Sequence, residues 1–200
     1  MKRIFLSFLI FFVGFFLVQT KAVSNSSDPE SFISEVIDQA KIILSSSASS
    51  EEKAEKLSEI ALRTVDVKGL AYYTLGKKRK EITPDELKKY EDLFEKYFLI
   101  SFTSRLTDYS DPKINVLSSE VVNNKYTIVK TMLLKTDKKP EVKIDWRVYT
   151  KDPNNPLIRD LIIEGLSLAR TQKEEFASVL NANNDDINVL FSTLERFIEK

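Results

Sequence analysis

Asp160 and Glu164 are the acidic side chains best placed in the sequence for acid–base chemistry, because they lie on an apolar segment that ends at Gly165. One of them could act as a general base while the hydroxyl of Tyr126 or Tyr149 stabilises a developing oxyanion, as in small isomerases. The chain contains no histidine and no cysteine. It therefore lacks the commonest general base, the commonest thiol nucleophile and the usual zinc ligands.

A structural role for these acids is the interpretation that we favour. Asp160 can pair with Arg147 or Arg159, and Gly165 allows a strand to turn into a helix. The sequence contains no nucleophile elbow, no glycine-rich phosphate loop and no metal-ligand cluster. We therefore expect a protein that is not an enzyme and that holds neither a metal nor a cofactor.

A second group of residues is apolar and could bury an apolar ligand. Thr83, Pro84 and Glu86 predict a capped helix start, and this helix is expected to run to about Tyr109. Its apolar residues recur at steps of three and four, so they share one stripe of the helix. They are Leu87, Tyr90, Phe94, Tyr97, Phe98, Phe102, Leu106 and Tyr109.

Alternating residues predict an apolar sheet face that could lie opposite this stripe. Every second residue of one predicted strand is apolar, and these residues share a face: Val142, Ile144, Trp146 and Val148. Leu161 and Ile163 share a face of the next predicted strand in the same way. The pattern leaves two interpretations open, the walls of a cavity or an ordinary filled core.

The elements that must position these residues follow an α+β order. Helices are expected to start at Asp28 and near Ser50, and to cover residues 67–75, 83–109, 171–181 and 185–199. Strands are expected over residues 113–121, 125–135, 141–150 and 157–164. The links between the strands are short, which makes the predicted sheet antiparallel. Residues 23–200 fit a single domain with a sizeable core.

The N-terminus has the pattern of an export signal. Lys2 and Arg3 precede an apolar stretch that ends at Val18, and a short segment with small residues follows it. We expect residues 1–22 to be a signal peptide that is removed, so that Val23 begins a mature periplasmic protein. A retained signal anchor is the alternative, but a bilayer span needs about 20 apolar residues and this stretch is shorter.

The balance of charge argues against nucleic acid as a partner. The chain has 30 basic and 30 acidic residues, and loss of residues 1–22 would leave a formal charge of −3. Two basic runs, Lys77 to Lys80 and Lys135 to Lys139, could contact an anionic headgroup, a membrane surface or an acidic partner. Runs of this kind are more often solvated loops, and that is the interpretation we prefer.

The C-terminal part of the chain resembles the toluene-tolerance, or MlaC-type, family of periplasmic phospholipid-binding proteins. Val142 to Arg147 matches the family's V-x-Y-R strand, Asp160 to Leu168 its aspartate-led strand and E-G-x-S-L turn, and Lys173 to Phe176 its basic-x-x-Phe helix start. A weaker match at Tyr73-x-Leu75-Gly76 and the Thr-Pro helix start extends the resemblance over most of the mature chain. Trp146 and Lys173 depart mildly, since the family more often carries Tyr and Arg there.

This resemblance implies a fold and a ligand. The implied fold is a curved four-stranded antiparallel sheet wrapped by N-terminal and C-terminal helices, a cone like that of nuclear transport factor 2 with an apolar cavity. The implied ligand is a phospholipid whose acyl chains lie in that cavity. The residues expected to line it are Tyr73, Phe94, Phe98, Phe102, Leu106, Ile144, Trp146, Val148, Leu161 and Ile163.

The resemblance also implies a function and its partners. The protein is expected to be a monomeric, non-catalytic carrier that moves phospholipid between an outer-membrane lipoprotein complex and an inner-membrane ABC transporter with a lipid-transfer domain. Such transport would support the lipid asymmetry of the outer membrane. Two alternatives stay open. One is a small periplasmic isomerase or hydrolase that acts on an apolar substrate in the same pocket, and the other is a structural adaptor that binds a partner through an apolar groove.

Overall fold

The computed structural model describes residues 28–107, 111–136 and 140–199. The predicted signal peptide lies outside the described residues, as do Tyr109 and part of the basic run from Lys135 to Lys139. The helices are α1 (Pro29–Leu44), α2 (Ser50–Thr64), α3 (Val67–Leu75), α4 (Pro84–Leu106), α5 (Leu168–Asn181) and α6 (Ile187–Ile198), with a short 3-10 helix η1 (Lys78–Lys80) before α4.

Local capping explains where the helices begin. The Asp28 carboxylate accepts a hydrogen bond from the backbone N–H of Ser31 at the start of α1. Thr83 and Glu86 form the predicted capping box of α4, in which each side chain bonds the backbone of the other. Sequence reasoning located these starts correctly because a cap joins residues only three positions apart.

The predicted antiparallel sheet is confirmed, and it has one short strand more than expected. Its strands run in the order β1 (Ile114–Asn123), β2 (Tyr126–Leu133), β3 (Val142–Tyr149), β4 (Leu157–Ile163) and β5 (Leu166–Ser167). Glu164 and Gly165 both have positive φ angles, 49° and 84°. They form a tight turn that folds β5 back onto β4. Leu166 and Ser167 of β5 then pair with Ile163 and Ile162 of β4 before α5 begins.

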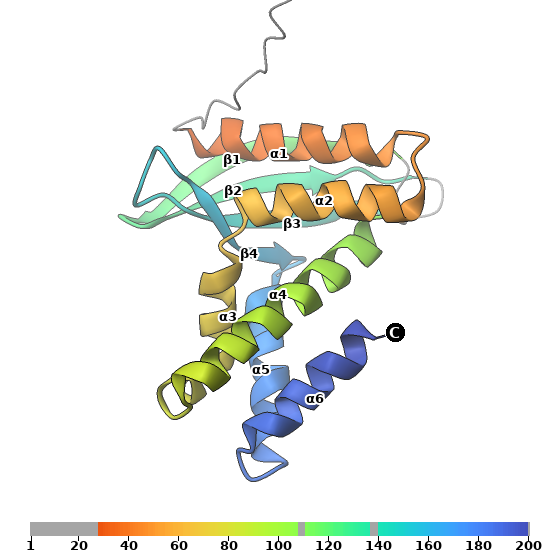
Figure 1. The fold of residues 1–200 in the computed structure, drawn as a ribbon. Helices are drawn as coiled ribbons and strands as arrows, with labels where there is room; N and C mark the ends of the chain where they lie inside the picture. The colour runs from red at the N-terminus through yellow and green to blue at the C-terminus, as the bar shows by residue number, and fades with distance from the viewer. Residues whose placement is uncertain (1–27, 108–110, 137–139, 200) are drawn as a thin grey trace, which may run out of the picture.

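Figure 1 shows two groups of helices around this sheet. Helices α1 and α2 lie along the sheet, and α1 contacts β1 and β2. Helices α3, α4, α5 and α6 lie below it in the view, where α3 and α5 contact β4. The arrangement confirms the predicted α+β class, with N-terminal and C-terminal helices packed against one antiparallel sheet.

The two groups of helices bury two separate cores. The sheet core consists of Phe32, Ile33, Val36, Ile37, Ile60, Val129, Val148 and Ile158. The helical core consists of Val67, Ala71, Leu75, Tyr90, Phe94, Phe176, Leu180, Ile187, Leu190, Phe191 and Leu194. Val65, in the link between α2 and α3, packs against both cores. Its backbone pairs with Ile158 of β4, which ties the helical group to the sheet.

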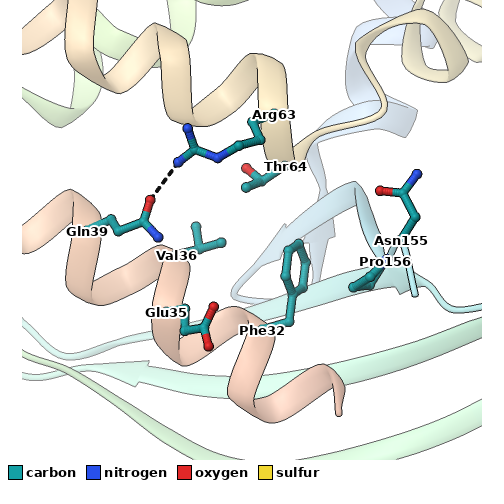
Figure 2. A pocket seen from close by; sticks show the side chains of 8 residues that line it. All are labelled: Phe32, Glu35, Val36, Gln39, Arg63, Thr64, Asn155 and Pro156. Atoms are coloured by element: carbon teal, nitrogen blue, oxygen red, sulfur yellow. Dashed lines mark hydrogen bonds between the residues drawn. The ribbon is translucent and has the colours of Figure 1, made fainter. Parts of the chain in front are cut away.

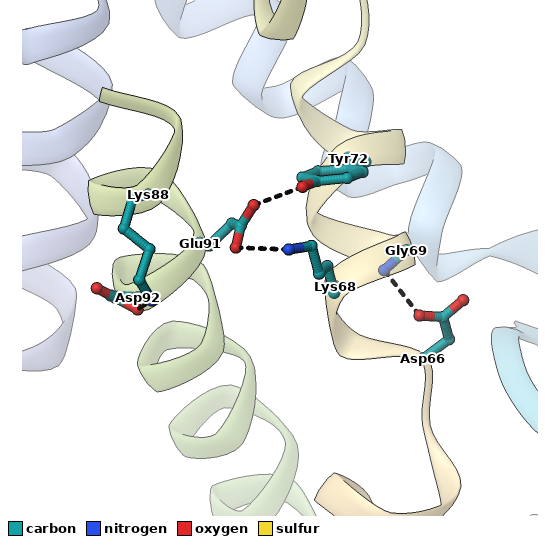
Figure 3. Close-up of polar contacts among 7 residues, drawn as sticks. All are labelled: Asp66, Lys68, Gly69, Tyr72, Lys88, Glu91 and Asp92. Atoms are coloured by element: carbon teal, nitrogen blue, oxygen red, sulfur yellow. Dashed lines mark hydrogen bonds and ion pairs between the residues drawn. The ribbon is translucent and has the colours of Figure 1, made fainter. Parts of the chain in front are cut away.

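A polar contact fastens α3 to α4, as Figure 3 shows. The carboxylate of Glu91 accepts a hydrogen bond from the Tyr72 hydroxyl at 2.6 Å and forms an ion pair with Lys68 at 3.1 Å. Burial by itself raises the pKa of Glu91, but the contacts with Tyr72 and Lys68 outweigh it, and the net effect lowers this pKa below the ordinary value.

This contact makes the free energy of unfolding depend on pH. A carboxylate with a lowered pKa contributes stability above its unfolded pKa of about 4.3, and the contribution is lost as the pH falls through the lower folded value. We expect Glu91→Gln to lose about 1–2 kcal/mol of unfolding free energy at neutral pH. Between about pH 5 and pH 3 the variant should lose less stability than the wild type does.

Urea titrations at several pH values would measure this difference. Glu95→Gln is a suitable control, because Glu95 is an exposed residue of the same helix. If the free energies of unfolding of wild type and Glu91→Gln fell in parallel with decreasing pH, the proposed role of the Glu91 carboxylate would be wrong.

Candidate functional site

The sheet residues predicted to line a cavity share one face and are direct cross-strand neighbours. Ile144 on β3 pairs with Ile163 on β4, and Trp146 pairs with Leu161. Val148 pairs with Ile158 after a register shift. The alternation seen in the sequence therefore produces a continuous apolar strip across two strands.

The α4 residues predicted to line the cavity form a stack along the helix. The ring centroids of Phe94 and Phe98 are 6.4 Å apart, and those of Phe98 and Phe102 are 5.7 Å apart. The rings are nearly parallel, with interplanar angles of 13° and 12°. Leu106 continues the stripe one turn later, at the last residue of α4. The aromatic stripe predicted from helical spacing is therefore present.

The C-terminal end of α4 and the beginning of β3 lie at the same end of the sheet. Ile114, the first residue of β1, pairs with Leu133, and Leu133 pairs with Val142 at the start of β3. Only a short connection separates Leu106 from Ile114, so the end of α4 lies within reach of this row of residues. Figure 1 shows α4 rising toward that end of the sheet.

Burial divides the predicted wall residues into two kinds. Phe94 is 3% exposed and Val148 is 0% exposed, and each belongs to a packed core. A residue of this kind fills space rather than lining it. Three further residues pack at the border of a core, namely Phe98, Trp146 and Leu161.

The remaining predicted residues are different. Ile144, Ile163, Phe102 and Leu106 are only partly buried, and they belong to neither core. Tyr73 is 44% exposed on α3, with the ammonium group of Lys173 4.9 Å from its ring centroid. Partly exposed apolar side chains gain more from covering by an apolar ligand than fully buried ones do, because they still contact water. Ile144, Ile163, Phe102 and Leu106 are therefore the best candidates for a ligand-contacting surface.

Two hollows in the described part of the molecule lie elsewhere. Figure 2 shows the smaller one, of about 20 Å³, which Phe32 of α1, Arg63 of α2 and Pro156 before β4 help to line. It is large enough for a single water molecule. The other, of about 380 Å³, is an open groove between α1 and β1. Neither hollow is lined by any of the ten residues, so their assignment to an acyl cavity stays a prediction.

Asp160 has a structural role, but its partners differ from those expected. Its carboxylate accepts hydrogen bonds from the Ser167 hydroxyl at 2.6 Å and from the backbone N–H of Ala169 at 3.0 Å. Ser167 in turn caps α5 by accepting from the N–H of Arg170. Asp160 thus fixes the start of α5 against β4, and both of its oxygens are occupied by donors within the chain.

Neither predicted ion pair of Asp160 is found among the described residues: Arg147 is its cross-strand neighbour but forms no ion pair with it, and Arg159 has other partners. The Arg159 guanidinium forms an ion pair with Asp66 and donates a hydrogen bond to the Tyr126 hydroxyl at 3.1 Å. Its charge also lies 4.2 Å from the ring centroid of Tyr149. The two side chains do not meet as an ion pair because each is already occupied: Asp160 by Ser167 and Ala169, and Arg159 by Asp66 and Tyr126.

These contacts weaken the acid–base interpretation. Glu164 is an exposed turn residue whose carboxylate accepts from the backbone N–H of Lys143. Tyr126 and Tyr149, the suggested oxyanion donors, are both held by Arg159. Among the described residues, no group of three or more acidic side chains is arranged to hold a metal ion.

One residue of the site was missed in the sequence. Thr131 of β2 is buried, and its hydroxyl accepts a hydrogen bond from the indole Nε1–H of Trp146 at 3.0 Å. The same hydroxyl donates to the carbonyl of Ile144 at 2.8 Å. Threonine is common on strands for its branched shape, so no local signal distinguishes one that orients a neighbouring aromatic ring.

The basic run of residues 77–80 comprises η1 and the residue before it, and all of its residues except the partly buried Lys78 are exposed. Lys78 forms an ion pair with Glu81 at 3.5 Å, and the guanidinium of Arg79 lies 5.8 Å from the ring centroid of Tyr72. Both groups therefore have partners within the chain, and the interpretation of the run as a solvated surface stays a prediction. Within the described ranges, no helix is both long enough and apolar enough to cross a bilayer.

Comparison with known proteins supports the family resemblance. The fold is similar to that of a phospholipid-binding protein from Ralstonia solanacearum, solved at 1.53 Å in complex with a phospholipid. The TM-score is 0.74 at 17% sequence identity, and the match covers 86% of this chain and 97% of that chain. No curated protein sequence matches this chain significantly. The sequence profile of the MlaC protein family matches residues 33–196, a range that includes all ten predicted wall residues and every residue of the two cores except Phe32. The chain therefore belongs to the MlaC family.

Proposed function

We propose that this protein is a carrier of glycerophospholipid. The observation that carries the proposal is the set of partly buried apolar residues that no core takes up, Ile144 and Ile163 on the sheet with Phe102 and Leu106 on α4. Membership of the MlaC family and the fold shared with a phospholipid-binding protein support the same ligand.

The energetics require such a surface. Burial of a methylene group yields about 0.8 kcal/mol, so moving an acyl chain of about 16 carbons into water costs roughly 13 kcal/mol. A carrier must cover nearly the whole chain to offset that cost. Side chains of α4 and the sheet that still contact water can provide the covering surface, because their own exposure falls when the lipid is bound.

The proposal includes a place of action and partners. We place the mature protein in the periplasm after removal of residues 1–22. There it would take phospholipid from one membrane-bound complex and deliver it to another, an outer-membrane lipoprotein complex and an inner-membrane ABC transporter. It would act without catalysis, and the occupied oxygens of Asp160 favour this reading over the isomerase or hydrolase alternative.

The test is to express the full chain, purify the secreted product without detergent and measure its mass under native conditions. We expect a protein that begins at Val23 and carries a noncovalent mass released as diacyl phospholipid by solvent extraction. The Asp160→Asn variant should bind the same phospholipid, because the carboxylate has no catalytic role in this proposal. A product that shows only its own mass, yields no lipid on extraction and takes none up from vesicles would contradict the carrier function.

A further inference from the structure

Trp146 lies at a boundary on the apolar face of β3 and β4. On one side of it the residues are packed in the sheet core, and on the other side they are only partly buried. Its side chain packs against the sheet core, together with its cross-strand neighbour Leu161. The next pair along the strands, Ile144 and Ile163, is partly buried and belongs to neither core. The apolar strip is therefore packed against protein on one side of Trp146 and available to a ligand on the other.

The space behind Trp146 is filled. Val148 is fully buried, as is Val129, which pairs with Trp146 from β2. Phe32 and Ile33 of α1 belong to the same core and close it on the helix side. An acyl chain that lay along β3 from Val142 would find no room past the indole, because this core is already closely packed.

The indole is held in place by hydrogen bonds. Its Nε1–H donates to the Thr131 hydroxyl at 3.0 Å, and that hydroxyl donates to the Ile144 carbonyl at 2.8 Å. Thr131 is itself buried, so water does not compete strongly for these bonds. These bonds favour the orientation in which the indole packs against the sheet core.

We propose that Trp146 is the end wall of the acyl site and limits the length of the acyl chains that the protein accepts. The inference rests on the proposed carrier function. Trp146 lies four positions after Val142 on β3, which corresponds to about 13 Å along the strand. A chain that exceeds the available length must leave its last methylenes uncovered, or displace the indole and break its bond to Thr131.

A fluorescence experiment with the unchanged protein tests where the chain ends. Trp146 is the only tryptophan of the chain, so its emission reports on this position alone. The probes are phosphatidylcholines brominated near the methyl end or near the carboxyl end of the acyl chain. We expect the first to quench Trp146 several-fold more strongly than the second, and equal or reversed quenching would overturn the end-wall proposal.

A competition experiment tests the limit on chain length. The protein is loaded from vesicles that contain equal amounts of phosphatidylethanolamines with chains of different length, and the bound lipids are identified by mass spectrometry. Each methylene that fits or fails to fit a defined pocket changes binding by about tenfold or more. We expect Trp146→Leu to enrich the longer lipids by about that factor relative to the wild type.

Two further variants separate the wall from general loosening of the fold. Thr131→Val keeps the size of the side chain but removes the hydrogen bond to the indole, and should broaden the range of chain lengths. Phe191→Leu loosens the helical core, which contains no residue of β3, and should leave the range unchanged. Trp146→Phe provides the same comparison should Trp146→Leu fail to fold.

The outcomes distinguish failure of the end-wall proposal from failure of the carrier function. If the wild type binds lipid and Trp146→Leu selects the same chain lengths as the wild type, the end-wall proposal is wrong while the carrier function stands. If no variant and not even the wild type takes up lipid, the carrier function fails and the end wall with it.

Discussion

Phe94→Ala will lower the free energy of unfolding by about 3–5 kcal/mol, whereas Phe102→Ala, two turns later on the same helix, will lower it by much less. Phe94 is 3% exposed and its ring contacts the rings of Tyr90, Tyr97 and Phe176, so its removal leaves a cavity in the helical core. Phe102 belongs to neither core and already contacts water. Its truncation removes the stacking contact with Phe98 but leaves no cavity in either core.

Urea denaturation of the lipid-free proteins, followed by circular dichroism, would give both values. The comparison is controlled internally, since the two variants lose the same atoms from the same helix. Equal losses of several kcal/mol would mean that the stripe on α4 is a filled core along its whole length. The interpretation of Phe102 as a ligand-contacting residue would then have to be abandoned.

Phe102→Glu will abolish lipid loading and leave the fold intact. In the lipid-free protein the new carboxylate can reach water, because this part of α4 is only partly buried. A bound lipid would displace that water, and the charged carboxylate would then lie against the acyl chain without a partner. An unpaired polar group in apolar surroundings costs at least about 1–3 kcal/mol, and a charge costs more, so binding should weaken by about a hundredfold or more.

Ile100→Glu is the matched control for this effect. Ile100 lies on the same helix but is 39% exposed, so the same charge there is solvated whether or not lipid is bound. Uptake of fluorescent phospholipid from vesicles should be lost in Phe102→Glu and retained in Ile100→Glu. Loss of uptake in both, or in neither, would contradict the assignment of the α4 stripe to the lipid site.

Much of the fold could be inferred from local signals. The starts of α1 and α4 follow from Asp28 and from the Thr83–Glu86 capping box, whose partners lie within one helical turn. The four long strands follow from alternation, and Trp146 and Leu161 indeed share a face. The start of α5 was predicted three residues too late, because its cap, Ser167, depends on a bond to Asp160 of another strand.

The candidate site was only partly accessible in the same way. Spacing grouped Phe94 with Phe102 and Val148 with Ile144, since members of each pair share a stripe or a strand face. The structure separates them: Phe94 and Val148 fill cores, whereas Phe102 and Ile144 remain partly exposed. Periodicity states which side of an element a residue occupies, but not how much protein covers that side.

By itself, the sequence determined the class of fold, the faces of the strands and helices, and the family, because these depend on residue types at short and regular spacings. Only the tertiary structure decided which apolar residues are packed and which stay open to a ligand. It also decided that Asp160 anchors α5 and that Thr131 orients Trp146. These outcomes depend on contacts between strands and helices far apart in the chain, whose distances are set by the packing of the whole domain and not by any local pattern.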